Sequence, residues 1–157
     1  MPKIDIDKLS LDSASAYPEP YRQVTLNRAR KRLGNAVGLS QFGVNLTMLK
    51  PGAWSAQRHW HANEDEFIYM VSGELVLHED SGETILRPGN AAGFKANSGN
   101  GHCLMNRTTH DAVYLEVGTR SVREKVDYPD IDMRLERDEK GNRYLHKDGK
   151  PYPGSER

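Results

Sequence analysis

The segment RHWHANEDEFIYMVSG, residues 58–73, places two of the six histidines of the chain one residue apart and follows them with a cluster of acids. Side chains alternate across a β-strand, so a strand through the histidines would put Gln57, His59 and His61 on one face. A turn at ANED would reverse the chain, and a second strand would begin at Glu66. The segment therefore predicts two imidazoles and a carboxylate side by side.

The second strand of this pair is apolar on both faces. Ile68 and Met70 would share the face of Glu66, and Phe67 and Tyr69 would lie on the other face with Val71. A strand covered on both sides is typical of a barrel whose outer wall packs against another sheet, a tail or a second subunit. We therefore expect a homodimer.

Short segments with β-branched and aromatic residues fill the chain around this pair, and Gly, Pro, Asn and Asp turn signals separate them. They are FGVNLTMLK, WSAQRHW, EFIYMVSG, ELVLHED, ETILRPG, AAGF, HCLMNRT and AVYLEVG. Many short strands at near-even spacing predict an all-β sandwich or barrel. We place this barrel at residues 41–118.

The two flanking regions differ from the barrel in composition. Residues 1–40 contain Pro18 and Pro20, which favour an extended N-terminal arm that packs on the barrel. Residues 119–157 form a charged C-terminal extension with too few apolar residues for its own core, so we expect it to wrap the barrel or fray. The whole chain is expected to be one domain.

Within the arm, the basic segment LNRARKRLGNAVGL, residues 26–39, has two possible structures. It can form a short helix that closes near Gly34, or a pair of strands that turns at Gly34 and Asn35. Its charge is expected to form a solvated face.

Composition excludes several classes of protein. The 157 residues include 22 Lys and Arg against 22 Asp and Glu, so no net field attracts nucleic acid or an anionic membrane. Cys103 is the single cysteine, which suits a reducing compartment, and we expect it to be a buried, unreactive residue. No apolar run approaches the roughly 18 residues of a membrane span, and we expect a cytoplasmic protein.

Two neutral imidazoles and a carboxylate that converge on one point form a site for a divalent transition metal, with positions left open for water or substrate. His102 is the candidate fourth ligand, because it begins a predicted strand after a glycine-rich loop. Burying two imidazoles and a carboxylate together without a bound ion would cost free energy. The other three histidines are expected to be structural, and no second carboxylate is clearly placed in the barrel.

These residues carry a resemblance to small single-domain bacterial cupins. That family has a first motif G-x5-H-x-H-x(3,4)-E-x6-G and a second motif G-x5-P-x-G-x2-H-x3-N. With one extra residue before the first histidine, the first motif is matched by Gly52, His59, His61, Glu66 and Gly73. With a two-residue insertion, the second is matched by Gly89, His102 and Asn106, while Lys95 and Asn97 replace the proline and glycine.

The resemblance implies a double-stranded β-helix, a conical antiparallel barrel of the jelly-roll type. It also implies one metal ion inside the barrel, held by His59, His61, Glu66 and His102. Iron, manganese, nickel, copper and zinc all suit such a set. Gln57 and Asn106 are candidates to orient a ligand or to contact substrate, and Lys95 is a candidate to meet an anionic substrate at the barrel mouth.

Three functions are compatible with this site. The first is a metal-dependent enzyme that acts on a small oxygenated carboxylate or sugar-like substrate by oxygenation, decarboxylation or isomerisation. The second is a non-catalytic module that binds or senses a small molecule. The third is a barrel whose metal only stabilises the fold. The sequence favours the first, and it does not identify the catalytic residues.

Overall fold

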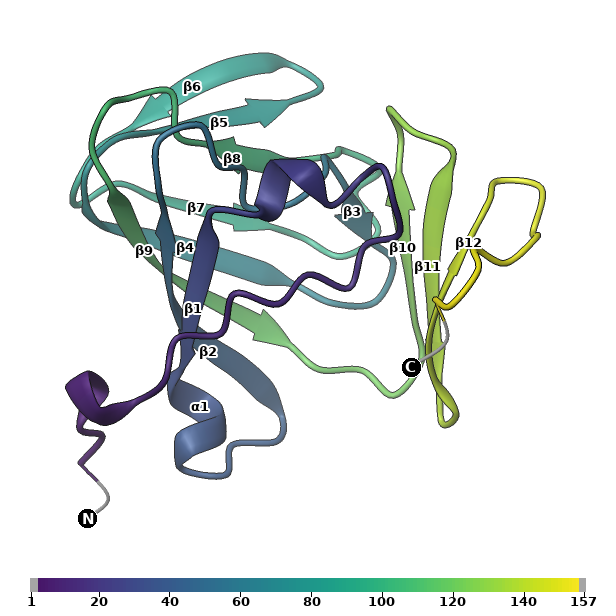
Figure 1. Ribbon diagram of the computed structural model, residues 1–157, viewed down its shortest axis with the longest axis horizontal. Coiled ribbons are helices and arrows are strands. Elements are labelled where there is room, and N and C mark those ends of the chain that lie inside the picture. Colours follow the sequence, from purple (N-terminus) through teal and green to yellow (C-terminus); the bar gives the residue numbers. More distant parts are fainter. Residues whose placement is uncertain (1–2, 156–157) are drawn as a thin grey trace.

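Strands dominate the computed structural model, which describes residues 3–155 (Figure 1). The largest sheet has five antiparallel strands in the order β1 (Arg28–Arg32), β2 (Phe42–Leu49), β9 (Ala112–Thr119), β4 (Glu66–Ser72) and β7 (Ala91–Phe94). The strand β1 extends this sheet beyond the barrel range that the sequence predicts.

Two smaller antiparallel sheets complete the strand framework. One has the order β6 (Gly82–Leu86), β5 (Leu75–Glu79) and β8 (Cys103–Met105). The other has the order β12 (Gly141–Leu145), β11 (Met133–Asp138), β10 (Glu124–Tyr128) and β3 (Trp60–His61). The predicted all-β, antiparallel class is confirmed.

Helices are few and short in the described residues. They are the 3-10 helices η1 (Ile6–Lys8) and η2 (Gln23–Thr25) and the α-helix α1 (Leu33–Ala36). None of these helices has the length and apolar character that crossing a membrane requires.

The main core lies against one face of β4, because side chains on this strand alternate between buried and exposed. Ile68 and Met70 are buried in a cluster with residues of β2, β5, β8 and β9, while Phe67, Tyr69 and Val71 are exposed on the other face. The buried face follows the predicted pattern. No part of residues 3–155 buries the exposed face, although the sequence analysis expects a cover for it.

The segment before the histidines is less regular than predicted. WSAQRHW was expected to be one strand, but residues 54–58 are mostly bends and β3 contains only two residues. The backbone donors of this segment bind acceptors in different elements: Trp54 N–H donates to Val24 O, and Ser55 N–H donates to Leu104 O. A continuous ladder with one neighbour therefore does not form.

In the structure, the basic segment near residue 30 forms a strand rather than a helix. β1 pairs with β2 along its whole length, and α1 forms part of the connection between the two strands. The helix alternative is wrong for residues 28–32, because their backbone groups pair with the open edge of β2.

The C-terminal extension has its own small core, contrary to the expectation from composition. Val126, Tyr128, Met133, Leu135 and Tyr144 are buried together in the sheet of β10, β11 and β12. The arm supplies Tyr17, whose ring meets the Tyr128 and Tyr144 rings edge-on at centroid distances of 5.7 and 5.8 Å. Tyrosine rings thus supply apolar area that a count of aliphatic residues misses.

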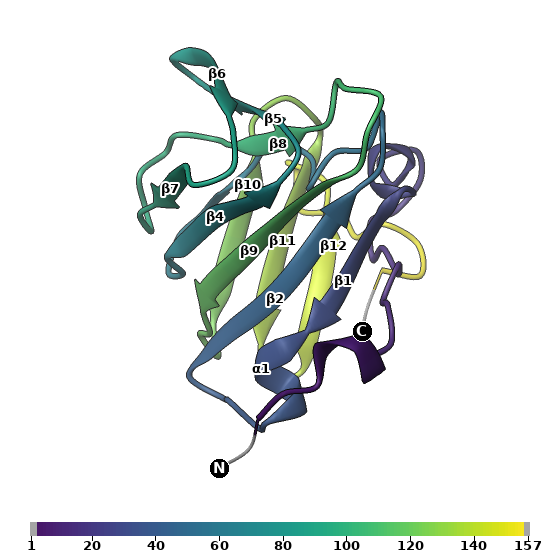
Figure 2. The same ribbon diagram turned by 90° about the vertical axis from the view of Figure 1, so that its left-hand side faces the viewer.

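The two larger sheets face each other as layers. β10, β11 and β12 lie behind β1, β2, β9 and β4 when the molecule is viewed as in Figure 2. The N-terminal arm crosses from the α1 end of the first layer to the second layer (Figure 1). This arrangement encloses the space in which the candidate site lies.

Replacing Met133 by Ala tests whether the C-terminal extension is an integral part of the fold. Met133 is fully buried, so the change removes core contacts and is expected to lower the free energy of unfolding by about 2–5 kcal/mol. Val122→Ala, at an exposed position, is the control and should change it by less than about 0.5 kcal/mol. Equal urea midpoints for the two variants would show that the extension contributes no core.

Candidate metal centre and its cavity

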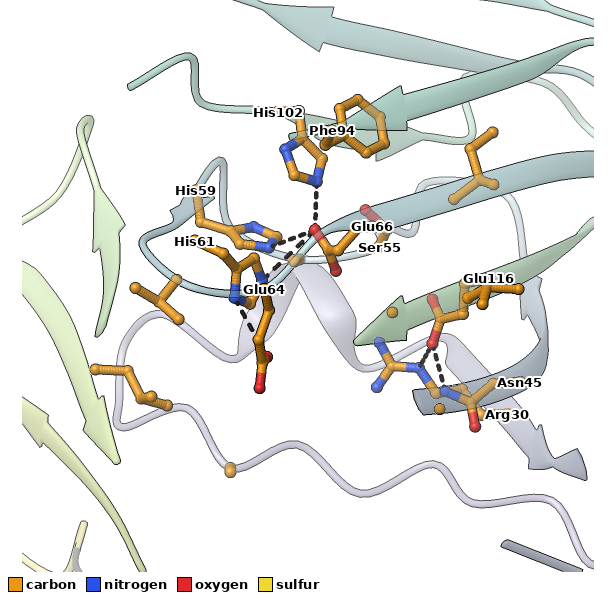
Figure 3. Close-up of a pocket in the computed structure, with 18 of the residues that line it drawn as sticks. Arg30, Asn45, Ser55, His59, His61, Glu64, Glu66, Phe94, His102 and Glu116 are labelled. Atoms are coloured by element: carbon orange, nitrogen blue, oxygen red, sulfur yellow. Dashed lines mark hydrogen bonds and ion pairs between the residues drawn. The ribbon is translucent and has the colours of Figure 1, made fainter. Parts of the chain in front are cut away.

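Three imidazoles converge on one carboxylate oxygen, Oε2 of Glu66 (Figure 3). The Nε2 atoms of His59, His61 and His102 lie 3.7, 3.5 and 2.8 Å from it. The structure thus brings together all four residues that the sequence analysis named as metal ligands.

The strand framework positions each of these side chains. His61 is in β3, while His59 and His102 exchange backbone hydrogen bonds of 3.1 and 2.9 Å as an isolated antiparallel bridge. Glu66 is the first residue of β4, where it pairs with Phe94 of β7 on one side and Gly118 of β9 on the other. The carboxylate therefore comes from an inner strand of the largest sheet, and the two neighbouring strands set its position.

Oxygen acceptors behind two of the rings set the tautomer, one by a hydrogen bond to His59 and the others as carboxylates that face His61. His59 Nδ1 lies 2.8 Å from the carbonyl oxygen of Gln57, which can only accept, so this nitrogen carries the proton. His61 Nδ1 faces Glu64 Oε2 at 3.6 Å and Glu124 Oε2 at 3.8 Å. In both residues Nε2 is therefore the nitrogen left to bind an ion.

Glu124 is held rigidly behind His61 by its other carboxylate oxygen. The backbone N–H groups of Ala62, Asn63 and Lys125 donate to Glu124 Oε1 at 3.0, 3.0 and 2.7 Å. Its Oε2 is buried and accepts no hydrogen bond from the described residues. A buried acceptor thus points toward Nδ1 of His61 with no other partner.

Charges in the cluster shift the pKa values of its members. Burial would raise the pKa of Glu66, but the three imidazoles outweigh burial and hold this pKa well below its usual range. Burial would lower the pKa of His61, yet Glu124 and Glu66 raise it to about 10. Burial lowers the pKa of His102. A cation bound at Nε2 of His61 would therefore displace a proton.

The donor set fits a divalent transition metal. Metal–ligand bonds of about 2.1 Å place neighbouring donor atoms roughly 3.0–3.4 Å apart, close to the distances around Glu66 Oε2. That oxygen is buried and accepts no hydrogen bond of regular geometry from the described residues, so it lacks the partner that a cation would supply. The donor atoms of His59, His61 and Glu66 all lie within 4.8 Å of one another.

His102 is the outlying member of the set. His59, His61 and Glu66 form a set of donor atoms within 4.8 Å of one another, and His102 is not in that set. Its Nε2 is nevertheless the nitrogen nearest to Glu66 Oε2. Its ring stacks on Phe94 with a centroid distance of 3.6 Å and an interplanar angle of 2°, which fixes the plane of the imidazole. The 2.8 Å contact and the fixed ring plane place His102 beside the same carboxylate oxygen as the other two imidazoles.

The loop before His102 explains one departure from the family motif. Asn97, which stands where cupins have glycine, has a φ of 58° in the left-handed region, and asparagine tolerates this conformation better than most residues. Its backbone N–H donates to His61 O at 2.7 Å. The altered loop is therefore tied to β3 beside the site.

The histidine cluster opens into a cavity of about 670 Å³ between the two layers. The arm, β1, β2, β9, β10 and β11 all contribute to its wall. Its charged lining residues are Arg28, Arg30, Arg32, Arg120, Arg137, Glu64, Glu66 and Glu116. A cavity of this size suits a small molecule, and its charge suits an anionic one.

The structure does not bring the three weaker candidates into this cavity. The Gln57 side chain donates to Tyr21 O at 2.8 Å, and its backbone carbonyl contacts His59 instead. Asn106 is buried directly after β8, where its side chain donates to Leu49 O and His110 O. Lys95 is exposed and lines a second, narrow crevice, which His61, Glu66 and His102 also border. The side-chain amides of Gln57 and Asn106 are therefore used in hydrogen bonds to the backbone.

Sequence reasoning missed several charged groups of the site. The expectation that no second carboxylate is placed in the barrel is wrong, because Glu64 and Glu116 both line the cavity. Arg28 and Arg30 were assigned to a solvated face, but they also line it. The alternating arginines of RARKR were the available signal, since a strand places every second residue on the same side.

Comparisons with known proteins agree with the fold. The cupin domain family model matches residues 45–118. A sugar phosphate isomerase of the cupin superfamily from Silicibacter pomeroyi is 43% identical, covers 99% of both chains and superposes with a TM-score of 0.93. A putative sugar phosphate isomerase from Acidithiobacillus ferrooxidans is 33% identical over 76% of each chain, with a TM-score of 0.72. The chain belongs to the cupin superfamily.

More distant structures share the fold alone. A predicted oxalate decarboxylase from Thermotoga maritima is 19% identical over 76% of this chain and 99% of that chain, with a TM-score of 0.62. The sequence matches no curated protein.

Replacing Glu124 by Gln tests the support behind His61. The variant keeps an oxygen for the three backbone donors but replaces the acceptor that faces His61 Nδ1 with an NH₂ group. We expect the affinity for Zn²⁺ or Mn²⁺, measured by competition with a chromogenic chelator, to fall by about 10-fold, because partners behind a ligand typically contribute 10–100-fold.

Lys125→Gln is the matched control, since Lys125 is the next residue of β10 and its side chain is exposed. It should bind these ions like the unchanged protein. If Glu124→Gln also does so, Glu124 does not support a ligand.

Proposed function

We propose that the chain is a metal-dependent isomerase of a small phosphorylated sugar. One divalent transition metal per chain would be held by His59, His61, Glu66 and His102. The observation that carries this proposal is that the convergent donor set opens directly into a cavity lined with arginines.

A bound ion would supply a Lewis acid for the carbonyl and hydroxyl oxygens of neighbouring carbons. The residues of the chain prepare this chemistry. Gln57 O and the carboxylate of Glu124 direct the Nε2 atoms of two histidines to one side. Phe94 covers one face of His102 and excludes water there. The open side of the cluster faces the cavity, where a sugar-sized molecule can enter.

Isomerisation agrees better with the site than the other reactions that the sequence left open. Interconversion of an aldose and a ketose moves hydrogen between neighbouring carbons and oxygens of one molecule, so it needs no oxidant or second substrate. The arginines suit the phosphate of such a substrate. The two similar structures described as sugar phosphate isomerases, one of them putative, support the same choice. The similarity to an oxalate decarboxylase extends only to the fold.

Replacing His61 by Ala tests the metal and the activity together. Loss of a direct ligand is expected to cost more than the 10–100-fold that is typical of its supporting partners, so turnover should fall by more than about 100-fold. Metal content by elemental analysis should drop well below one ion per chain. Turnover is measured by NMR on a panel of aldose and ketose phosphates.

The control is His110→Ala, because His110 is an exposed histidine outside the cavity. It should keep both metal and turnover. Stoichiometric metal in the His61→Ala protein would reject the site. Metal loading without conversion of any sugar phosphate by the unchanged protein would reject the reaction but leave the site.

The homodimer expected from the sequence remains a prediction, as does the cytoplasmic location. Phe67, Tyr69 and Val71 are 44%, 43% and 48% exposed on one face of β4, and a second copy of the chain is the cover that we expect. Light scattering should give about twice the chain mass of 17.7 kDa. Tyr69→Lys should shift the mass toward the monomer, while Val122→Lys, outside this sheet, should not. A monomer for the unchanged protein contradicts the expectation.

A further inference from the structure

We propose that Arg28 and Arg30 of β1 form the site that binds the phosphate group of the substrate, across the cavity from the metal ligands. This inference rests on the proposed function for its substrate class, but the anion site itself can be tested without turnover.

Alternation along β1 directs its arginines into the cavity. Arg28, Arg30 and Arg32 all line the cavity, as every second residue of a strand must share a face. Lys31 lies on the opposite face, where its Nζ donates to Ile6 O at 2.8 Å. The cavity therefore receives three cations from one strand that lies outside residues 45–118, the part matched by the family model.

Neighbouring strands fix the direction of Arg30. Its Nε lies 2.9 Å from Oε1 of Glu116 in β9, and the same oxygen accepts a hydrogen bond of 2.8 Å from Asn45 Nδ2 in β2. Figure 3 shows the two terminal nitrogens of Arg30 pointing away from Glu116, into the space between this group and the histidine cluster. Two donors on one edge of the guanidinium are thus presented to a ligand, in the arrangement that binds two oxygens of a phosphate.

Arg28 is a buried cation without an anionic partner. It is 7% exposed, and its terminal nitrogens donate to two neutral carbonyl oxygens, Ser55 O and Ala14 O. Burial lowers the pKa of Arg28, and the charge of Arg30 lowers it further. A buried charge is costly unless an opposite charge compensates it. Within the described residues, no carboxylate forms an ion pair with Arg28, so an anion from solution would stabilise this part of the cavity.

The balance of charge favours a dianion. Arg32 pairs with Asp12 and Arg137 pairs with Glu64 at 2.6 Å, so their charges are compensated within the chain. Arg120 also lines the cavity, and among the described residues it donates to neutral oxygens and forms no ion pair. Arg28, Arg30 and Arg120 against the one negative charge of Glu116, which pairs with Arg30, therefore leave two net positive charges. A phosphate monoester carries about two negative charges at neutral pH, against one for a carboxylate. Because the histidine cluster lines the same cavity, one molecule can place its phosphate at β1 and its carbonyl end at the metal ligands.

Inorganic phosphate is the probe, and isothermal titration calorimetry is the measurement. Metal-loaded protein and chelator-treated protein are both titrated, because phosphate can also bind a metal ion directly. We expect phosphate to bind in both forms and Arg30→Gln to weaken it by at least about 10-fold, the loss of one charge-assisted pair of hydrogen bonds. Acetate at matched ionic strength should bind more weakly than phosphate.

Lys31→Gln is the matched control, since it removes one positive charge from the other face of the same strand. It should leave phosphate affinity unchanged. Arg28→Gln is a second variant, which removes the cation that has no anionic partner, and it should also weaken phosphate binding. Circular dichroism of each variant verifies that it is folded. The inference is overturned if phosphate binding disappears on chelation, if Arg30→Gln binds phosphate like the unchanged protein, or if acetate binds equally well.

Turnover in the same samples separates this inference from the proposed function. Arg30→Gln should raise KM for a phosphorylated sugar by at least about 10-fold while metal content stays unchanged. Arg30-dependent phosphate binding without any isomerase activity would reject the function and support the anion site. Isomerase activity with an unchanged KM in Arg30→Gln would support the function and reject the assignment of the phosphate.

Discussion

The convergence of three imidazole nitrogens on Oε2 of Glu66 is the constraint on which the rest of this structure depends. The four residues come from three parts of the strand framework: β3, the bridge between His59 and His102, and the first position of β4. A slip of one residue in β4 would turn Glu66 away from the cavity and expose Ile68 and Met70. The same register that buries the core therefore also places the carboxylate.

The parts of the chain outside the family match complete this site. The arm provides one wall of the cavity, β1 provides its arginines, and β10 provides the carboxylate behind His61. The tyrosines that join the arm to the C-terminal sheet keep these parts together. These parts give the barrel with its metal-binding cluster a cavity of about 670 Å³ that is lined with arginines.

Local patterns predicted much of the fold and part of the site. Alternation in EFIYMVSG identified β4 and its buried face, and motif spacing brought His102 to the cluster although it lies far along the chain from His59. The two-residue β3 was not predictable in the same way, because the bends before it depend on acceptors in η2 and near β8. Tertiary hydrogen bonds there override the propensity of a short aromatic segment.

The missed residues share a physical reason. Asn45 and Glu116 are 71 residues apart, and they hold Arg30 only because β2 lies between β1 and β9 in the sheet. Glu124 reaches His61 only through the pairing of β10 with β3. The periodicity of residue types along the sequence does not indicate which strands pair. The side chains of Gln57 and Asn106 stay out of the cavity for the opposite reason, because a motif position does not show which backbone groups will bind a side-chain amide.

X-ray absorption at the metal edge of the purified, metal-loaded protein tests the central claim most directly. The account predicts a single type of site with three imidazole nitrogens and at least one oxygen at about 2.0–2.2 Å, and the loss of one imidazole contribution in His102→Ala. A spectrum with only oxygen neighbours, or one unchanged by His102→Ala, would contradict the convergence of these groups on a common ion.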